Sequence, residues 1–201
     1  MELGPHPSQT DFTISGNKIQ RANIIKDLGV QIESNLKFNT HINEIVSRAH
    51  QRSSLIIRSF LSRDIGNLVR GFKTYIRPLL EYASPVWSPS HIILINSVEA
   101  VQRRFTKRLP GMTHLSYAER LSHLKLQSLE QRRLFTDLTT CYNIIHGLTS
   151  LTFAEFFTFS RNKSSRGHPL RLEIPLTQKN TYKQFFLVES STPGIPSHLS
   201  L

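Results

Sequence analysis

The sequence predicts a mainly α-helical fold, in which a short N-terminal β-hairpin precedes a bundle of four to five amphipathic helices and an irregular C-terminal tail. Apolar and polar residues alternate in the first part of the chain, as they do in strands. From residue 40 to residue 147 the apolar residues instead recur every three or four positions, as on a helix face. Beyond residue 147 this periodicity is lost. The 201 residues are enough for one domain with a hydrophobic core.

The strand-like part begins where Phe12 and Ile14 alternate with polar residues, and Gly16-Asn17 supplies a tight turn after them. A second apolar run follows and contains Gly29, and a glycine within a strand often marks a bulge or a close backbone approach. The two runs predict a short antiparallel sheet. Because an isolated hairpin is only marginally stable, we expect the other strands of that sheet to lie outside this chain.

The helical segments are delimited by residues that start or stop a helix. Asp64 suits the N-cap of the second segment, and Pro78 should end that segment at or near Arg77, because proline lacks an N–H group. Gly147 suits the C-cap of the last segment. The apolar face of the last helix is expected to comprise Leu134, Leu138, Tyr142 and Ile145. Helices are expected at about 40–60, 64–77, 94–109, 116–124 and 128–147.

The chain is expected to divide into five parts, namely a disordered start at 1–10, the β segment at 11–38, the helical domain at 39–147, a partly ordered extension at 148–190 and a disordered tail at 191–201. The N-terminus lacks the pattern of a signal peptide, and no apolar run approaches the ~20 residues of a membrane span. Cys141, the only cysteine, excludes an internal disulfide and favours a reducing compartment, either nuclear or cytoplasmic.

A rigid corner interrupts the helices at the sequence RPLLEYASPVWSP, residues 77–89. Its three prolines exclude one continuous helix. Trp87, the only tryptophan, is interpreted as a buried plug that orients two helices, and an exposed platform for stacking a base is the alternative. Glu81 lies about one turn after Arg77 and is expected to pair with it rather than to act as an acid catalyst.

The formal net charge of +11 predicts attraction to a polyanion. Residues 41–150 hold fifteen of the 25 lysines and arginines and only seven of the 14 acidic residues, and most of these cations are arginines, whose fork suits phosphate oxygens. The alternative is an ordinary solvated helix surface, with Glu99 and Glu130 as partners. The candidate nucleic-acid-binding residues form two clusters, Arg103, Arg104, Lys107 and Arg108, and Arg132 and Arg133.

The residues needed for independent catalysis are missing from the sequence. The four aspartates are far apart, whereas two-metal nucleotidyl transfer needs paired carboxylates. No Gly-rich phosphate loop, dinucleotide fingerprint or Gly-x-Ser-x-Gly elbow occurs. Zinc is not expected either, because the chain contains no Cys-x-x-Cys. We therefore expect no cofactor and no catalytic residue in this chain.

Four segments in order, KDLGVQIESNLKFNTHI, IRPLLEYASPVWSP, VEAVQRRFTKRLPGM and YAERLSHLKLQSLEQRRLFTDL, closely resemble a known family. The family is that of the LINE-type, jockey-like non-LTR retrotransposon reverse transcriptases, and the resemblance is to the region after their polymerase core. It covers roughly residues 11–190. Each motif is weak by itself, but four motifs in the same order and at natural spacing are specific.

The resemblance implies that the β segment is a remnant of the palm sheet, in which Leu28, Gly29 and Val30 are similar to the primer grip. The helices are similar to the thumb, which clamps the RNA or DNA template–primer duplex through its phosphates, so the two basic clusters would contact phosphates. The family's fingers, most of its palm and its Tyr-x-Asp-Asp motif would lie upstream of residue 1. Mg²⁺ is therefore expected only in a full-length parent enzyme.

The resemblance leads to one expectation and leaves two alternatives. The chain is expected to be a fragment of an RNA-directed DNA polymerase that binds nucleic acid, binds no membrane and is inactive by itself. A separate palm and fingers segment is its second candidate partner. The first alternative is a non-enzymatic helical adaptor that binds another protein. The second is a non-functional genomic relic, and the end STPGIPSHLSL, which resembles a shifted or truncated terminus, agrees with it.

Overall fold

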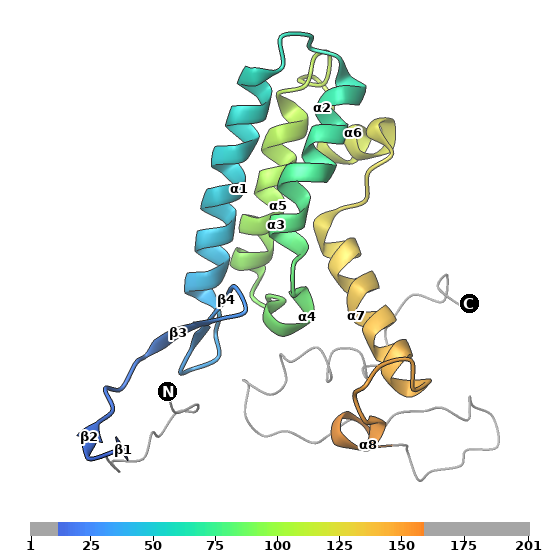
Figure 1. The fold of residues 1–201 in the computed structure, drawn as a ribbon. Coiled ribbons are helices and arrows are strands. Elements are labelled where there is room, and N and C mark those ends of the chain that lie inside the picture. Colours follow the sequence, from blue (N-terminus) through green and yellow to red (C-terminus); the bar gives the residue numbers. More distant parts are fainter. Residues whose placement is uncertain (1–11, 159–201) are drawn as a thin grey trace, which may run out of the picture. The chain divides into compact units, whose positions relative to one another are not determined.

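The computed structural model describes residues 12–158, which form two compact units (Figure 1). The predicted fold class is confirmed, because the described residues are mainly helical and begin with short hairpins. The first unit comprises Met1–Ala83 and Pro89–Leu129, and the second comprises Ser84–Ser88 and Glu130–Leu201. The predicted disorder at 1–10 and 191–201, and most of the extension at 148–190, lie outside the described residues.

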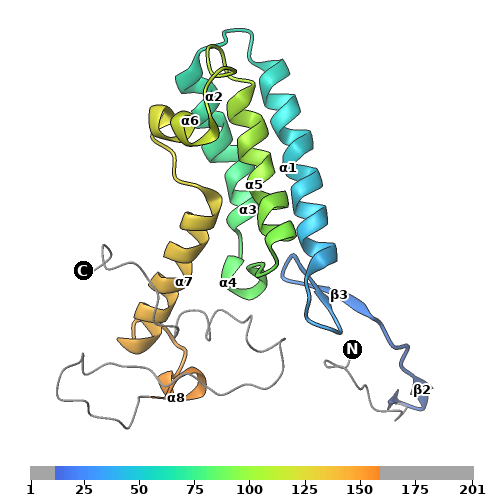
Figure 2. The same ribbon diagram turned by 180° about the vertical axis from the view of Figure 1, so that it is seen from behind.

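Three helical rods form the bundle of the first unit, and the views in Figures 1 and 2 agree on their arrangement. The first rod is α1 (Asn39–Ser59), the second consists of α2 (Ile65–Gly71), η1 (Phe72–Ile76) and α3 (Arg77–Glu81), and the third is α5 (Ile92–Lys107). α1 and α5 run side by side in the same direction. The second rod runs in the opposite direction and leads the chain from the end of α1 back towards the start of α5. The short helix α6 (Tyr117–Leu124) packs against α5.

Apolar stripes of the three rods form the core, as the periodicity predicted. Phe72 and Phe105 lie at its centre with their ring centroids 4.8 Å apart. Burying each large side chain of this kind contributes roughly 1.5–3 kcal/mol. Gly71 of α2 lies close to α1, since a Cβ there would be in van der Waals contact with Ile56, at 3.4 Å. The other buried members include Ile42, Ile45, Ala49, Leu68, Ile76, Leu80, Val98 and Val101.

Pro78 does not end the second helix, so the boundary expected at or near Arg77 was wrong. The helix widens into a π-helical turn over η1, in which the Arg77 N–H donates to the carbonyl of Phe72, and then continues to Glu81. Pro78 thus lies in the first turn of α3, where its missing N–H costs little. As predicted, no continuous helix spans residues 77–89. Ala83, at φ 53°, separates α3 from α4 (Ser84–Trp87).

The β segment consists of two separate two-stranded hairpins rather than the one sheet that we expected. β1 (Thr13–Ile14) pairs with β2 (Asn17–Lys18), and β3 (Ile24–Asp27) pairs with β4 (Val30–Glu33). The first turn is at Ser15-Gly16, one residue earlier than predicted. Gly29 is not a bulge within a strand, because Leu28 and Gly29 form the two-residue turn of the second hairpin, both with positive φ.

β4 is attached to the first turns of α1 by polar contacts. The Thr40 N–H donates to Glu33 Oε1 at 2.7 Å, which satisfies one of the free donors at the helix start. The Gln31 N–H donates to His41 Nδ1 at 3.3 Å, and the Gln31 amide donates to Glu44. His41 is buried, and this burial lowers the pKa of its imidazole. The hairpin therefore depends on a neutral His41.

Three helix ends follow local sequence signals. Asp64 caps α2 as predicted, since its Oδ1 accepts from the Asn67 N–H at 2.7 Å. Gly147, at φ 65°, ends α7 (Leu129–Ile145) as predicted, and the Leu148 N–H donates to the carbonyl of Asn143 at 2.8 Å. A complete capping box at α6, between Ser116 and Glu119, was not foreseen.

The second unit contains α4, most of α7 and α8 (Phe153–Phe156). Phe157 is buried in one cluster with Cys141 and Ile144, and the burial raises the pKa of the Cys141 thiol. The apolar residues predicted for α7 are only partly those that the structure covers, since Ile145 packs against this cluster. The buried positions are Leu129, Arg133, Asp137, Cys141 and Ile144, whereas Leu134, Leu138 and Ile145 are half-buried and Tyr142 is exposed.

Leu28→Asn should stabilise the second hairpin. Leu28 has φ 43° and is 85% exposed, so it loses little packing on replacement, whereas asparagine tolerates this backbone conformation far better. We expect a gain of about 1 kcal/mol, seen as roughly fivefold slower hydrogen exchange of the Asp27 and Val30 amides. Leu28→Val, which is β-branched, should accelerate the exchange. Equal exchange in both variants would contradict the assigned turn.

Acidification below about pH 6.5 should weaken the fold. The pKa values of His41 and His50 are lowered from 6.5, chiefly by burial, so the unfolded chain binds more protons once the pH falls through 6.5. The stabilisation is therefore present above that pH and is lost below it. The free energy of unfolding, measured in urea between about pH 7.5 and pH 5.5, should fall. The double variant His41→Gln/His50→Gln should flatten this slope, and an unchanged slope would exclude both histidines as its source.

Candidate nucleic-acid interface

The seam between α1 and α5 carries an exposed basic stripe, which consists of Arg104, Lys107 and Arg108. Positions 104, 107 and 108 lie on one face of α5, and two of them, Arg104 and Arg108, lie near residues of α1. The Arg108 Nη1 group donates to Ser54 Oγ of α1 at 3.3 Å. Arg104 lies close enough to His50 of α1 to lower the pKa of that imidazole further, after burial. None of the three cations forms an ion pair with a carboxylate within residues 12–158.

Arg103 was predicted to act with this stripe, but it faces α6 instead. Its guanidinium lies 5.2 Å from the centre of the Tyr117 ring, at a cation–π distance. Its backbone carbonyl accepts from Arg120, a buried arginine of α6. Arg120 also donates to Thr106 Oγ1 at 3.2 Å. The exposed basic face of α5 is therefore formed by three residues of the predicted cluster, and Arg103 lies at its margin.

A pocket of about 690 Å³ opens where α1 and α5 end. Four cations line it, Arg58 and Arg63 from the end of α1 and the segment after it, and Lys107 and Arg108 from the end of α5. The stripe thus leads into the pocket through the two residues that they share. The remaining lining residues are Ile57, Phe60, Leu61 and Thr113.

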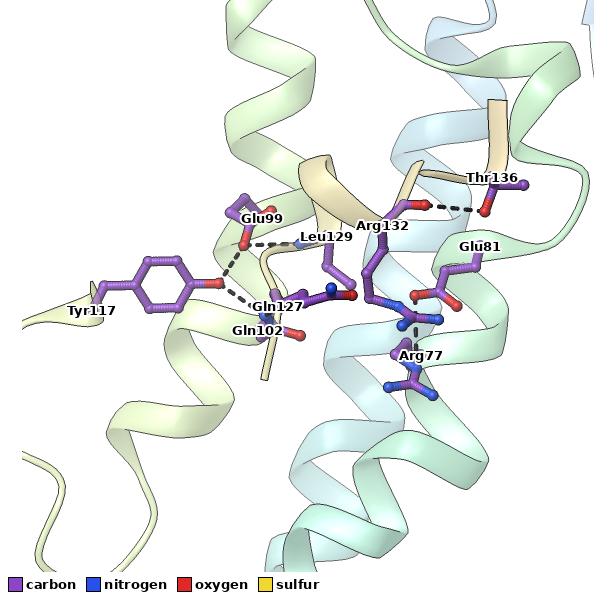
Figure 3. A network of polar contacts seen from close by, with 9 residues as sticks. All are labelled: Arg77, Glu81, Glu99, Gln102, Tyr117, Gln127, Leu129, Arg132 and Thr136. Carbon is purple, nitrogen blue, oxygen red and sulfur yellow. Dashed lines mark hydrogen bonds and ion pairs between the residues drawn. The ribbon is translucent and has the colours of Figure 1, made fainter. Parts of the chain in front are cut away.

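A buried polar network on the other side of α5 fixes that helix against the chain that follows it (Figure 3). Glu99 is buried and its Oε1 accepts from the Tyr117 hydroxyl and, at 3.3 Å, from the Leu129 N–H. Gln102 donates to Tyr117 at 3.1 Å and to the carbonyl of Gln127 at 2.9 Å. Burial, reinforced by the bond to Glu99, raises the pKa of Tyr117 strongly, so its hydroxyl remains a donor. The alternative of a solvated helix surface expected Glu99 to be a partner on that surface, but Glu99 is buried.

The other predicted basic pair is less available than expected. Arg133 is only 3% exposed and Arg132 is half-buried. A buried guanidinium cannot reach a phosphate without a rearrangement, so we leave Arg133 out of the candidate surface. Conversely, Arg58 and Arg63 were not among the predicted binding residues. They lie more than 40 residues before Lys107 and Arg108 in the sequence, and no sequence pattern indicates that the four residues share a pocket.

The remaining predicted residues have structural positions. Trp87 is 1% exposed, so its ring is not available to stack on a base. Arg77 Nε lies 3.7 Å from Glu81 Oε1, in the ion pair that the spacing suggested (Figure 3). Leu28 and Gly29 form the exposed tip of the second hairpin, and Val30 is buried at the start of β4. The carbonyl of Leu28 accepts from the Tyr82 hydroxyl at 2.9 Å, which holds the tip in place.

Within residues 12–158, no three side chains among His, Cys, Asp and Glu gather closely enough to hold a metal ion. Over the same residues, no helix combines the length and the apolar character that crossing a membrane requires.

Comparison with known proteins assigns the chain to no family. No family model matches it, and no solved structure matches it. An uncharacterized protein of Caenorhabditis elegans is 26% identical to it over 133 residues, which cover 65% of this chain and 67% of that protein. This similarity carries no activity, so the function has to be argued from the basic surface.

Tyr117→Phe should destabilise the first unit. The substitution leaves the buried Glu99 carboxylate with one donor fewer, and an unsatisfied buried group costs about 1–3 kcal/mol. The free energy of unfolding, measured by urea denaturation, should fall by that amount. Tyr75→Phe, which removes an exposed hydroxyl from η1, is the matched control and should change it by less than about 0.5 kcal/mol. Similar losses in the two variants would show that the network contributes little.

Proposed function

We propose that this chain binds duplex or hybrid nucleic acid through the phosphate backbone, as the thumb-like part of a LINE-type retrotransposon reverse transcriptase. The observation that carries the proposal is the stripe of Arg104, Lys107 and Arg108, three exposed cations on one helix face without a carboxylate partner in the described chain. Like charges so close together repel one another unless an anion lies between them, and phosphates supply that anion.

The spacing of the stripe supports a nucleic-acid backbone as the ligand. Arg104 and Arg108 are separated by four residues, which rise by about 6 Å along the helix. Successive phosphates of one strand advance by about 3.4 Å along a duplex axis, so a rise of about 6 Å spans roughly two phosphate steps. Contacts of this kind position a duplex without reading its sequence.

The proposed role is binding without chemistry. The resemblance places the metal-binding aspartates of the parent enzyme outside this chain, so Mg²⁺ and nucleotidyl transfer would belong to a separate palm. The hairpins are suited to that arrangement, since Ile24 and Ile25 of β3 are 46% and 37% exposed. In this proposal the helical bundle contributes affinity and the palm contributes catalysis.

A protein-binding adaptor is a second candidate, favoured by one observation. Ile92 and Ile93 at the start of α5 are 65% and 79% exposed, which is unusual for adjacent isoleucines. A stable protein partner that survives nuclease treatment and is lost in Ile92→Ser/Ile93→Ser would support the adaptor. If nuclease treatment instead releases the partner, nucleic acid alone held it to the chain, and the first proposal is supported.

The salt dependence of binding tests the phosphate contacts. For the unmodified chain and a blunt DNA duplex, log affinity should fall linearly with log salt concentration, by about 0.9 for each phosphate neutralised. Arg104→Gln/Lys107→Gln should reduce the slope by roughly 2 and weaken binding equally for all sequences. Fluorescence anisotropy at several salt concentrations measures both quantities.

The matched control is Lys37→Gln/Arg70→Gln, which removes the same charge from exposed positions outside the stripe. It should leave the slope within about 0.5 of the unmodified value, because distant charges do not displace counterions at the contact. A salt-independent affinity, or equal effects of the two double variants, would refute a specific phosphate-binding stripe.

A further inference from the structure

The pocket at the ends of α1 and α5 differs from the stripe in having an apolar side. Its cations are Arg58, Arg63, Lys107 and Arg108, whereas Phe60 and Leu61 supply an aromatic ring and an aliphatic side chain at its opening. Leu61 is 96% exposed and Phe60 is 36% exposed. A leucine that is so fully exposed stabilises the folded chain little, so its position is not explained by the core.

Ser54 orients two of the cations towards this pocket. Its carbonyl accepts from Arg58 Nε at 3.2 Å, and its hydroxyl accepts from Arg108 Nη1 at 3.3 Å. Both contacts use one edge of a guanidinium and leave further N–H donors for a ligand. Among the described residues that line the pocket there is no carboxylate. The two arginines, one on each helix, are thus held ready for a common anion.

We infer that this pocket binds an unpaired nucleotide next to the duplex, with the phosphate on Arg58 and Arg108 and the base against Phe60 and Leu61. The inference rests on the proposed function, because the stripe would deliver the strand to the pocket through Lys107 and Arg108. The pocket volume of about 690 Å³ lies within the range of small-molecule sites, roughly 300–1,000 Å³.

An unpaired nucleotide fits this combination better than a duplex does. In a duplex the bases are stacked inside and only the phosphates are exposed, so Phe60 and Leu61 would gain nothing from it. An unpaired base presents an apolar face, and stacking on an aromatic side chain stabilises a single-stranded complex by about 1–3 kcal/mol per base. Cations beside an aromatic ring are the usual composition of single-strand sites.

The test compares a blunt duplex with the same duplex carrying a short single-stranded overhang, at either the 3′ or the 5′ end. The unmodified chain should bind one overhang at least about fivefold more tightly than the blunt end, as stacking of one base implies. Leu61→Ser and Phe60→Leu should abolish this preference and leave the affinity for the blunt duplex unchanged. Phe60→Leu keeps an apolar side chain at the end of α1 but removes the ring.

Ile93→Ser is the matched control, because it replaces another strongly exposed apolar residue that does not line the pocket. It should retain the overhang preference. A second arm adds tripolyphosphate, which has negative charge but no base, as a competitor. It should displace the overhang less effectively than a short oligonucleotide of equal charge.

Failure of this inference is distinguishable from failure of the proposed function. If blunt and overhanging duplexes bind equally well and with the salt dependence expected of the stripe, the pocket does not take a nucleotide and the phosphate-binding function stands. Equal displacement by tripolyphosphate would likewise reduce the pocket to an anion site and overturn the role of the base. If neither duplex binds at low salt, both proposals are wrong.

Discussion

The buried carboxylate of Glu99 is the constraint on which the helical unit depends. A charged group inside a protein is tolerated only when hydrogen bonds replace its lost water, and here Tyr117 and the Leu129 N–H supply them. These donors come from the start of α6 and the start of α7, so one side chain of α5 fixes where the chain must return after each loop. Arg120 strengthens this arrangement by donating to Thr106, the penultimate residue of α5.

This polar anchor leaves α5 with three distinct faces. Val98, Val101 and Phe105 enter the core, Glu99 and Gln102 bind the chain that follows, and the remaining face is free to be basic. Because packing and hydrogen bonds hold the first two faces, the backbone positions of the three cations stay close together on the third. The same rigidity that costs free energy in the isolated chain therefore prepares the surface for a polyanion.

The basic stripe and the pocket also have separate origins. The stripe follows from the sequence of a single helix, whereas the pocket exists only because α1 and α5 end at the same level. Ser54 connects the two parts, since it contacts an arginine of each helix. A surface assembled in this way can combine charge with an aromatic ring, which neither helix provides by itself.

The sequence by itself determined the features that depend on neighbours along the chain. These are the helical periodicity, the Asp64 cap, the Gly147 stop and the sharing of one face by Arg104, Lys107 and Arg108. Only the tertiary structure decided that the helix passes Pro78 through a π-helical turn, that Arg133 is buried, and that Arg58 and Arg63 join Lys107 and Arg108. The physical reason is one of range. Propensities and caps act over about one helical turn, whereas burial and pocket formation depend on which distant segments compete for the same space.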